Sequence, residues 1–171
     1  MIPVLVAVFY LPFKNHLLFA SGIFAVAAAT DWVDGYLARR LGQMTKLGAF
    51  LDPVADKLMV VIALVLLVER YDTIVFTLAA CVIIGREIVV SALREWMAEL
   101  GQRTSVAVSY VGKVKTAFQM VAIVGLLAVD PAKDEGWLLL LSYALLYTAA
   151  VLTLWSMFNY LKAAWDVTKD Q

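Results

Sequence analysis

The chain has 171 residues and a formal net charge of zero, because 14 Lys and Arg residues balance 14 Asp and Glu residues. Hydrophobic residues make up 63% of it and charged residues 16%, against roughly half and a quarter in soluble domains. The apolar excess indicates a membrane protein, and the neutral balance argues against nucleic-acid binding. Cys81 is the single cysteine, which excludes an internal disulfide, and its apolar neighbours predict a buried thiol.

The first predicted helix, within residues 1–14, is short. Its apolar run covers about a dozen residues, whereas a membrane span needs about 20. The segment has neither a basic start nor a small-residue cleavage site, so it does not resemble a signal peptide. We therefore expect a first helix that is truncated at its N-terminus.

Five longer apolar stretches follow, and polar segments separate them. Their length and the absence of strict alternation favour helices over strands. No internal repeat or linker is visible, so residues 1–171 are predicted to form one all-α domain, a polytopic membrane bundle of six transmembrane helices. The five stretches cover approximately residues 17–37, 48–68, 74–93, 106–129 and 137–161.

Basic residues are concentrated on one side of this arrangement. The turn with Arg39, Arg40 and Lys46 and the turn at residues 94–103 would face the same compartment. The positive-inside rule places that side in the cytoplasm.

Four carboxylates surround the turn between the second and third predicted helices. Asp31 and Asp34 are three residues apart, and Asp52 and Asp56 are four apart, so each pair occupies one helix face. A short turn makes the two helices antiparallel neighbours, which brings the faces together at the cytoplasmic ends of the spans.

Such a cluster needs positive charge, because four carboxylates in a low-dielectric site repel one another unless they are protonated or neutralised. Oxygen ligands without nearby Cys or His suit Mg²⁺ or Mn²⁺, and two such ions can neutralise a pyrophosphate. The structural alternative is that the carboxylates are solvated or paired with Arg39, Arg40 and Lys57. The convergence of two spaced pairs favours the metal site.

The run from Asp31 to Asp56 has the pattern D-x2-D-G-x2-A-R-x8-G-x3-D-x3-D. Every specified position matches the signature of the CDP-alcohol phosphatidyltransferases, and the chain resembles that family. The resemblance implies that Asp31, Asp34, Asp52 and Asp56 bind the metal ions and that Asp56 is also the general base. It further implies that the CDP-lipid site contains Asp31, Gly35, Ala38, Arg39 and Gly48.

A basic set follows in the second half of the chain: Arg86, Arg94, Lys113 and Lys115. Several cations in one pocket suggest an acceptor alcohol with its own phosphate, such as glycerol 3-phosphate. The alternatives are an Arg86–Glu87 structural pair and lysines that extend to the membrane interface.

Three stretches, residues 85–87, 91–96 and 112–116, resemble the phosphatidylglycerophosphate synthases of this family. That resemblance implies transfer of the phosphatidyl group from CDP-diacylglycerol to glycerol 3-phosphate, with release of CMP. It also implies a homodimer among the lipids of the bacterial cytoplasmic membrane, with the active site facing the cytoplasm. The Asn-x-x-Thr-x-x-Arg segment with which such synthases usually begin has no match before Ile2.

Other functions remain open at this point. Within the family, a cardiolipin or phosphatidylserine synthase is the nearest rival. The basic set distinguishes between these enzymes, because it favours an acceptor that carries its own phosphate. From a different class, a divalent-metal transporter would also place carboxylates in the membrane, although transporters favour midplane sites and repeated halves. A third alternative, a non-catalytic assembly subunit, would not explain why four carboxylates converge.

Overall fold

A computed structural model describes residues 1–41, 46–99, 110–133 and 136–169. Within these ranges the chain forms six helices and no strand. They are α1 (Ile2–Tyr10), α2 (His16–Leu41), α3 (Lys46–Tyr71), α4 (Ile74–Glu99), α5 (Tyr110–Ala128) and α6 (Trp137–Lys169). The side chains that lie outside the description, although their backbone is helical, are those of residues 31, 32, 34–41, 46–53, 98, 110–113, 163–164 and 166–169.

Two tight connections fold the chain into hairpins of helices. Asn15, between α1 and α2, has a φ of 66°, and Asp72, between α3 and α4, has a φ of 38°. Asn and Asp tolerate this left-handed region better than most residues. Thr73 then caps α4, because its hydroxyl oxygen accepts a hydrogen bond from the backbone N–H of Phe76. Each hairpin therefore returns the chain within a few residues.

The predicted helices are all present, and four of them are longer than the predicted apolar stretches. α2 continues to Leu41, α3 covers Lys46–Tyr71, α4 continues to Glu99 and α6 to Lys169. The extensions are rich in Ala, Leu, Arg, Lys and Glu, which are good helix formers although they are not all apolar. Hydropathy identified the helices, but it could not find where they end.

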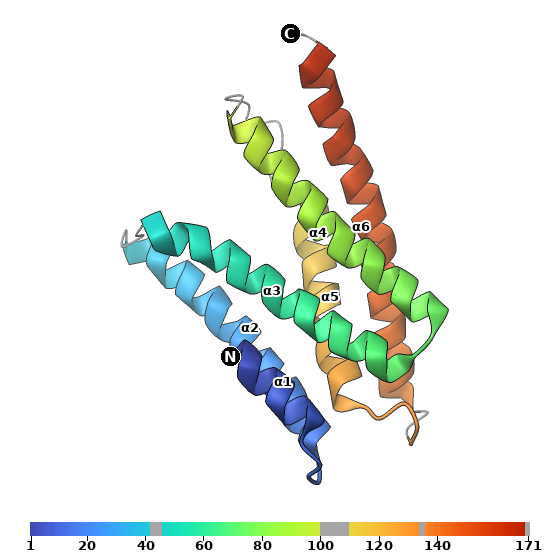
Figure 1. Cartoon of the computed structure of the whole chain (residues 1–171). Helices are drawn as coiled ribbons and strands as arrows, with labels where there is room; N and C mark the ends of the chain where they lie inside the picture. The colour runs from blue at the N-terminus through green and yellow to red at the C-terminus, as the bar shows by residue number, and fades with distance from the viewer. Residues whose placement is uncertain (42–45, 100–109, 134–135, 170–171) are drawn as a thin grey trace.

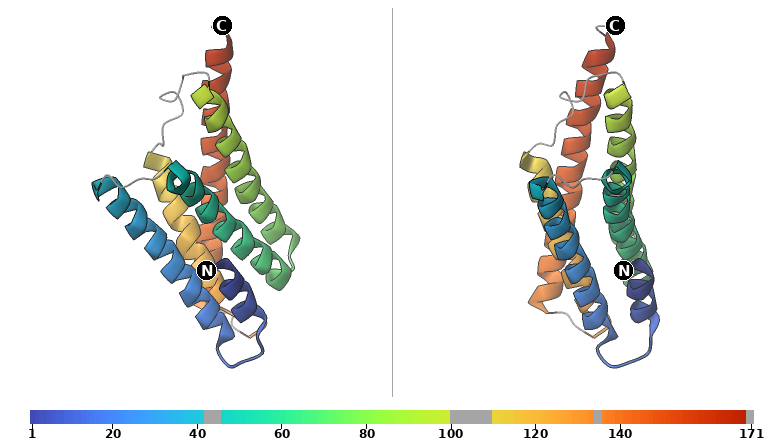
Figure 2. Two further views of the ribbon diagram at one scale, coloured as in Figure 1. Left: turned by 60° about the vertical axis from the view of Figure 1, so that its left-hand side comes forward. Right: turned by 90° about the vertical axis from the view of Figure 1, so that its left-hand side faces the viewer.

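The helices pack into one bundle (Figures 1 and 2). α5 contacts both α2 and α6, α4 lies along α6, and the short α1 lies against α2. Apolar side chains from all six helices form the core, with Phe24, Leu67 and Ile123 among those fully buried. α5 and α6 approach each other closely at Gly125, where an added Cβ would meet the Ser142 hydroxyl at 2.1 Å.

The outer surface is apolar on the described part of the bundle. Ile74, Trp137 and Leu140 are each more than 70% exposed. Two helices, Ile74–Met97 and Trp137–Lys162, are long and apolar enough to cross a membrane, whereas His16–Thr30 and Val114–Ala128 are shorter apolar helices. Exposed apolar surface of this kind indicates a membrane protein. The expectation that Cys81 is buried is wrong, because its side chain is on the exposed outer surface of α4.

Candidate active site

The signature residues lie at adjoining helix ends. Asp31 and Asp34 are in the last three turns of α2, and Asp52 and Asp56 are in the first three turns of α3. α2 ends at Leu41 and α3 begins at Lys46, so the two ends can be at most about 18 Å apart. The helices run in opposite directions from this junction (Figure 1), as the sequence predicts. Both halves of the signature are therefore at one end of the bundle.

The side chains of most signature residues lie outside the described set. This holds for Asp31, Asp34, Gly35, Ala38, Arg39, Gly48 and Asp52. The carboxylate of Asp56 is described, and it is exposed on α3. The described side chains include no group of three or more His, Cys, Asp or Glu residues that could hold a metal ion. As donors, the four aspartates offer only oxygen, which fits a hard divalent cation.

A hydrogen bond joins this acidic segment to α4. The Lys57 ammonium, next to Asp56 in the chain, donates to the hydroxyl of Ser91. Ser91 lies on α4 between Arg86 and Arg94, two members of the predicted basic set. The contact therefore places the start of α3 beside the part of α4 that carries those cations.

Arg86, Glu87 and Lys115 form a buried ionic cluster between α4 and α5. Arg86 donates a 2.6 Å hydrogen bond to Oε1 of Glu87. The ammonium of Lys115 lies 3.6 Å from the same oxygen, and its side chain is only 1% exposed. A buried cation is costly unless it is paired, and here two cations share one carboxylate oxygen.

Arg94 is a third basic residue of this region, eight positions after Arg86 on α4. Arg86 and Lys115 contact the carboxylate of Glu87, whereas Arg94 contacts Tyr160. Each cation also has a buried nitrogen without a hydrogen-bond partner: Nε of Arg86, Nε of Arg94 and Nζ of Lys115. Positive charge and unused donors both favour an anionic ligand.

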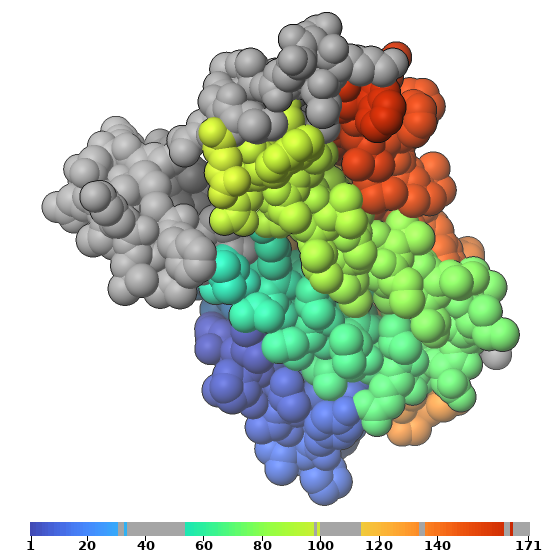
Figure 3. Space-filling model, turned by 45° about the horizontal axis from the view of Figure 1, so that its top comes forward, coloured from blue at the N-terminus to red at the C-terminus, as the bar shows by residue number. Residues whose placement is uncertain are grey.

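Tyr160 of α6 contacts the guanidinium of Arg94. The guanidinium donates a 3.0 Å hydrogen bond to the Tyr160 hydroxyl and lies 5.3 Å from the centre of the Tyr160 ring. Figure 3 shows the end of the molecule where the last described turns of α4 lie next to α6.

The structure brings together two of the four predicted basic residues, Arg86 and Lys115, on one carboxylate. Arg94 lies further along α4 against Tyr160, and the side chain of Lys113 lies outside the described set. The alternative of an Arg86–Glu87 pair is confirmed as a contact. The alternative that Lys115 extends to the interface is wrong, because its ammonium is buried. Sequence reasoning missed Glu87 as a partner of Lys115, and it also missed the Lys57–Ser91 and Arg94–Tyr160 contacts. These contacts join different helices, so no local pattern signals them.

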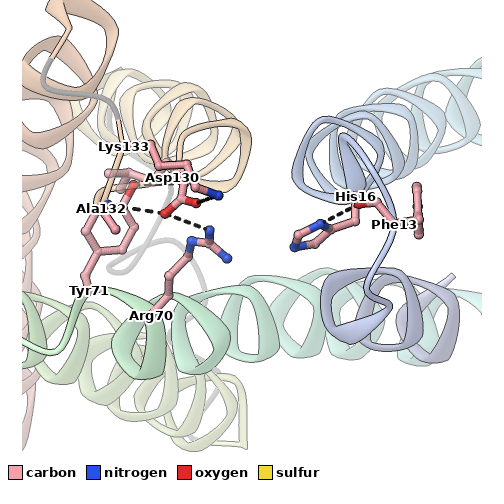
Figure 4. Close-up of polar contacts among 8 residues, drawn as sticks. Phe13, His16, Arg70, Tyr71, Asp130, Ala132 and Lys133 are labelled. Atoms are coloured by element: carbon pink, nitrogen blue, oxygen red, sulfur yellow. Dashed lines mark hydrogen bonds and ion pairs between the residues drawn. The ribbon is translucent and has the colours of Figure 1, made fainter.

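A second polar group forms where α3 and α5 end (Figure 4). Asp130, in the loop after α5, contacts Arg70 at 3.2 Å and Lys133 at 3.0 Å. The hydrogen bond from Lys133 is the main reason that the pKa of Asp130 is below its usual value, with smaller contributions from Ala132 and Arg70. The group lies at the opposite end of α3 from Asp56, so it is separate from the candidate active site.

A family model provides the deciding comparison. Residues 1–155 match the model of the CDP-alcohol phosphatidyltransferases. The chain belongs to the CDP-alcohol phosphatidyltransferase family.

Three bacterial relatives in this family have a chain length close to that of the present one. A Yersinia pestis protein is 58% identical over 166 residues, which are 97% of this chain and 89% of the relative. A Yersinia enterocolitica protein is 58% identical over 165 residues, covering 96% and 88%. A Salmonella choleraesuis protein is 56% identical over 171 residues, covering 100% and 92%. Each is named CDP-diacylglycerol–glycerol-3-phosphate 3-phosphatidyltransferase.

Proposed function

We propose that this chain transfers the phosphatidyl group of CDP-diacylglycerol to glycerol 3-phosphate, giving phosphatidylglycerophosphate and CMP. The relatives named for this reaction support the proposal, as does their coverage of nearly the whole chain. The structural observation that carries it is the pair of buried cations, Arg86 and Lys115, that share the carboxylate of Glu87.

This cluster fits the phosphate of the acceptor. A phosphate dianion would balance the second of the two cations that share Glu87, and its oxygens would accept from Nε of Arg86, Nε of Arg94 and Nζ of Lys115, which have no hydrogen-bond partner. An acceptor without a phosphate, such as serine, offers less negative charge and fewer acceptor oxygens to these donors. The cluster therefore favours glycerol 3-phosphate over the acceptor of a phosphatidylserine synthase.

The signature aspartates fit the other substrate. Asp31, Asp34, Asp52 and Asp56 would hold two Mg²⁺ or Mn²⁺ ions, and Arg39 with Gly35, Ala38 and Gly48 would receive the CDP group. When bound, such ions neutralise the pyrophosphate and make its phosphorus easier to attack. Because α2 and α3 meet next to the α4 segment of Ser91, both substrates would approach the same end of the bundle.

Asp56 would act as the general base, because a hydroxyl is a weak nucleophile until it loses its proton. In the transfer, Asp56 takes the proton from the primary hydroxyl of glycerol 3-phosphate. The hydroxyl oxygen bonds to the phosphorus that carries the diacylglycerol. The bond from that phosphorus to the bridging oxygen breaks, and CMP leaves with the electron pair. Lys57 stays next to this step through its hydrogen bond to Ser91.

The surroundings of the site suit a lipid substrate. We place the bundle in the bacterial cytoplasmic membrane, with the signature end facing the cytoplasm. The exposed apolar side chains support contact with lipid, and the basic residues of the turns near positions 39–46 and 94–103 support the orientation. In this placement the lipid substrate reaches the aspartates from within the membrane, and the acceptor arrives from the cytoplasm.

The test is release of CMP by the full chain purified in detergent. CDP-diacylglycerol is supplied with Mg²⁺ or Mn²⁺, and glycerol 3-phosphate, serine, inositol and phosphatidylglycerol are added in turn, each with an EDTA control. We expect metal-dependent release with glycerol 3-phosphate alone. Release with serine or phosphatidylglycerol instead would keep the family and reject the acceptor. No release with any alcohol would reject the activity for this chain.

A further inference from the structure

The third helix of the basic cluster, α6, carries a residue that no motif points to. Tyr160 is 66 positions from Arg94 in the chain, and it is 7% exposed. It is the hydrogen-bond acceptor for one terminal nitrogen of Arg94, and its ring lies under the guanidinium. The two contacts together hold that guanidinium against α6.

The surroundings make Tyr160 a rigid support. Val90 and Met97 of α4 are buried with Tyr160 in a small apolar cluster, and Leu93 and Met157 pack against it. Arg94 occupies the α4 face between these apolar residues. An arginine has four rotatable side-chain bonds, so an unsupported guanidinium would lose considerable entropy when it binds a phosphate. Holding it in advance reduces that loss.

Arg94 keeps a donor that Tyr160 does not use. One terminal nitrogen is bonded to Tyr160, while Nε is buried and has no hydrogen-bond partner. Lys115 also has a buried nitrogen without a hydrogen-bond partner. The donor that Tyr160 uses is therefore different from the donors of Arg94 and Lys115 that lack a partner.

We infer that Tyr160 is a positioning residue for the acceptor site: it holds the Arg94 guanidinium in the orientation in which Arg94 and Lys115 bind the acceptor's phosphate. This inference rests on the proposed function. Tyr160 itself acts through Arg94, so its effect is on acceptor affinity, and not on the chemical step or on the CDP-lipid.

The test compares variants of the full chain in detergent, with KM measured separately for glycerol 3-phosphate and CDP-diacylglycerol. Tyr160→Phe keeps the ring and removes the hydroxyl. We expect about a tenfold rise in the KM for glycerol 3-phosphate, the size of one hydrogen bond to a charged group. Turnover at saturation and the KM for CDP-diacylglycerol should change less than twofold. Tyr160→Leu removes the ring as well and should raise the acceptor KM further.

Two controls separate positioning from a general structural role. Tyr147→Phe removes a half-buried hydroxyl from the same helix, and it should leave both KM values unchanged. In an Arg94→Ala background, Tyr160→Phe should have no further effect on the acceptor KM, because the residue through which it acts is gone. Additive effects of the two substitutions, or equal rises in both KM values, would overturn the inference.

The two proposals fail in different ways. If the unsubstituted chain releases CMP with glycerol 3-phosphate but Tyr160→Phe does not alter the acceptor KM, only the role of Tyr160 is rejected. If the unsubstituted chain does not use glycerol 3-phosphate, the proposed function is rejected before any variant is compared.

Discussion

The guanidinium of Arg86 donates a 2.6 Å hydrogen bond to the carboxylate of Glu87, the next residue along α4. Adjacent residues on a helix normally point about 100° apart, so the pair meets only because both side chains turn toward the same buried region. Lys115 approaches that carboxylate from α5. Glu87 therefore orients two cations without cancelling their combined charge.

Removing one of these cations should weaken acceptor binding selectively. For Arg86→Ala we expect the KM for glycerol 3-phosphate to rise at least tenfold, because a charge-assisted hydrogen bond is lost, while the KM for CDP-diacylglycerol changes less than twofold. Lys133→Ala, at an exposed cation outside the cluster, is the matched control and should change neither. Equal increases in both KM values for Arg86→Ala would contradict the assignment of Arg86 to the acceptor.

Removing the carboxylate of Glu87 should destabilise the protein, and a bound phosphate ligand should restore part of that stability. Glu87→Gln leaves Arg86 and Lys115 without a negative partner, so we expect a loss of about 3 kcal/mol of unfolding free energy. Thermal unfolding in detergent measures it. Saturating glycerol 3-phosphate should raise the Tm of the variant more than that of the unsubstituted chain.

Glu95→Gln supplies the comparison for that experiment, because Glu95 is an exposed carboxylate on the same helix. It should have almost no effect on the Tm. A Glu87→Gln variant with an unchanged Tm would show that the cluster is already neutralised in another way.

Asp56→Asn tests the proposed base. The amide cannot accept the proton of the acceptor hydroxyl, so turnover should fall at least a hundredfold. Binding of CDP-diacylglycerol in the presence of Mg²⁺ should be largely kept, and equilibrium binding measures it. Asp72→Asn, an exposed aspartate just after α3, should be fully active. Appreciable turnover by Asp56→Asn would falsify the base assignment.

The contacts of Asp130 predict a pH dependence of stability. The pKa of Asp130 is lowered from 3.8 in the folded protein, so its ionised form is favoured by folding. Its contribution is therefore complete above about pH 5, and it is lost as the pH falls through 3.8 toward the lowered value. Asp130→Asn should lower the Tm by about 2–4 °C at neutral pH, and this difference should disappear in acid. A difference that stays constant with pH would exclude the linkage.

The contact between α5 and α6 predicts a packing defect. In Gly125→Ala the new Cβ would lie 2.1 Å from the hydroxyl oxygen of Ser142 and 3.2 Å from its Cβ. The hydroxyl must leave its hydrogen bond to the Leu138 carbonyl, or the two helices must separate slightly. We expect a loss of about 1–3 kcal/mol in unfolding free energy. Gly22→Ala is the matched control, because a Cβ there meets nothing within 4 Å. It should be neutral or slightly stabilising, since alanine favours a helix over glycine.

The sequence predicted the helices and the residue types of the site better than it predicted contacts. Hydropathy located all six helices, and spacing assigned the aspartates to adjoining helix ends, because both depend on residues near one another in the chain. The exposure of Cys81 was predicted wrongly, and the burial of Lys115 contradicts only the alternative in which its side chain extends to the membrane interface. Both depend on which side of a helix meets its neighbours, and helices that are apolar all round carry little of that information.

The length of α6 has a consequence for where the two substrates can meet. Its 33 residues extend for about 50 Å, whereas the hydrocarbon core of a bilayer is about 30 Å thick. If the apolar segment Trp137–Lys162 crosses the membrane, Tyr160 lies at its border, at the level of the lipid headgroups. A water-soluble phosphate ester and a lipid anchored by two acyl chains both have access to that level. The two reactants can then meet at the membrane–water interface. The polar acceptor need not enter the hydrocarbon core, and the lipid need not leave the membrane.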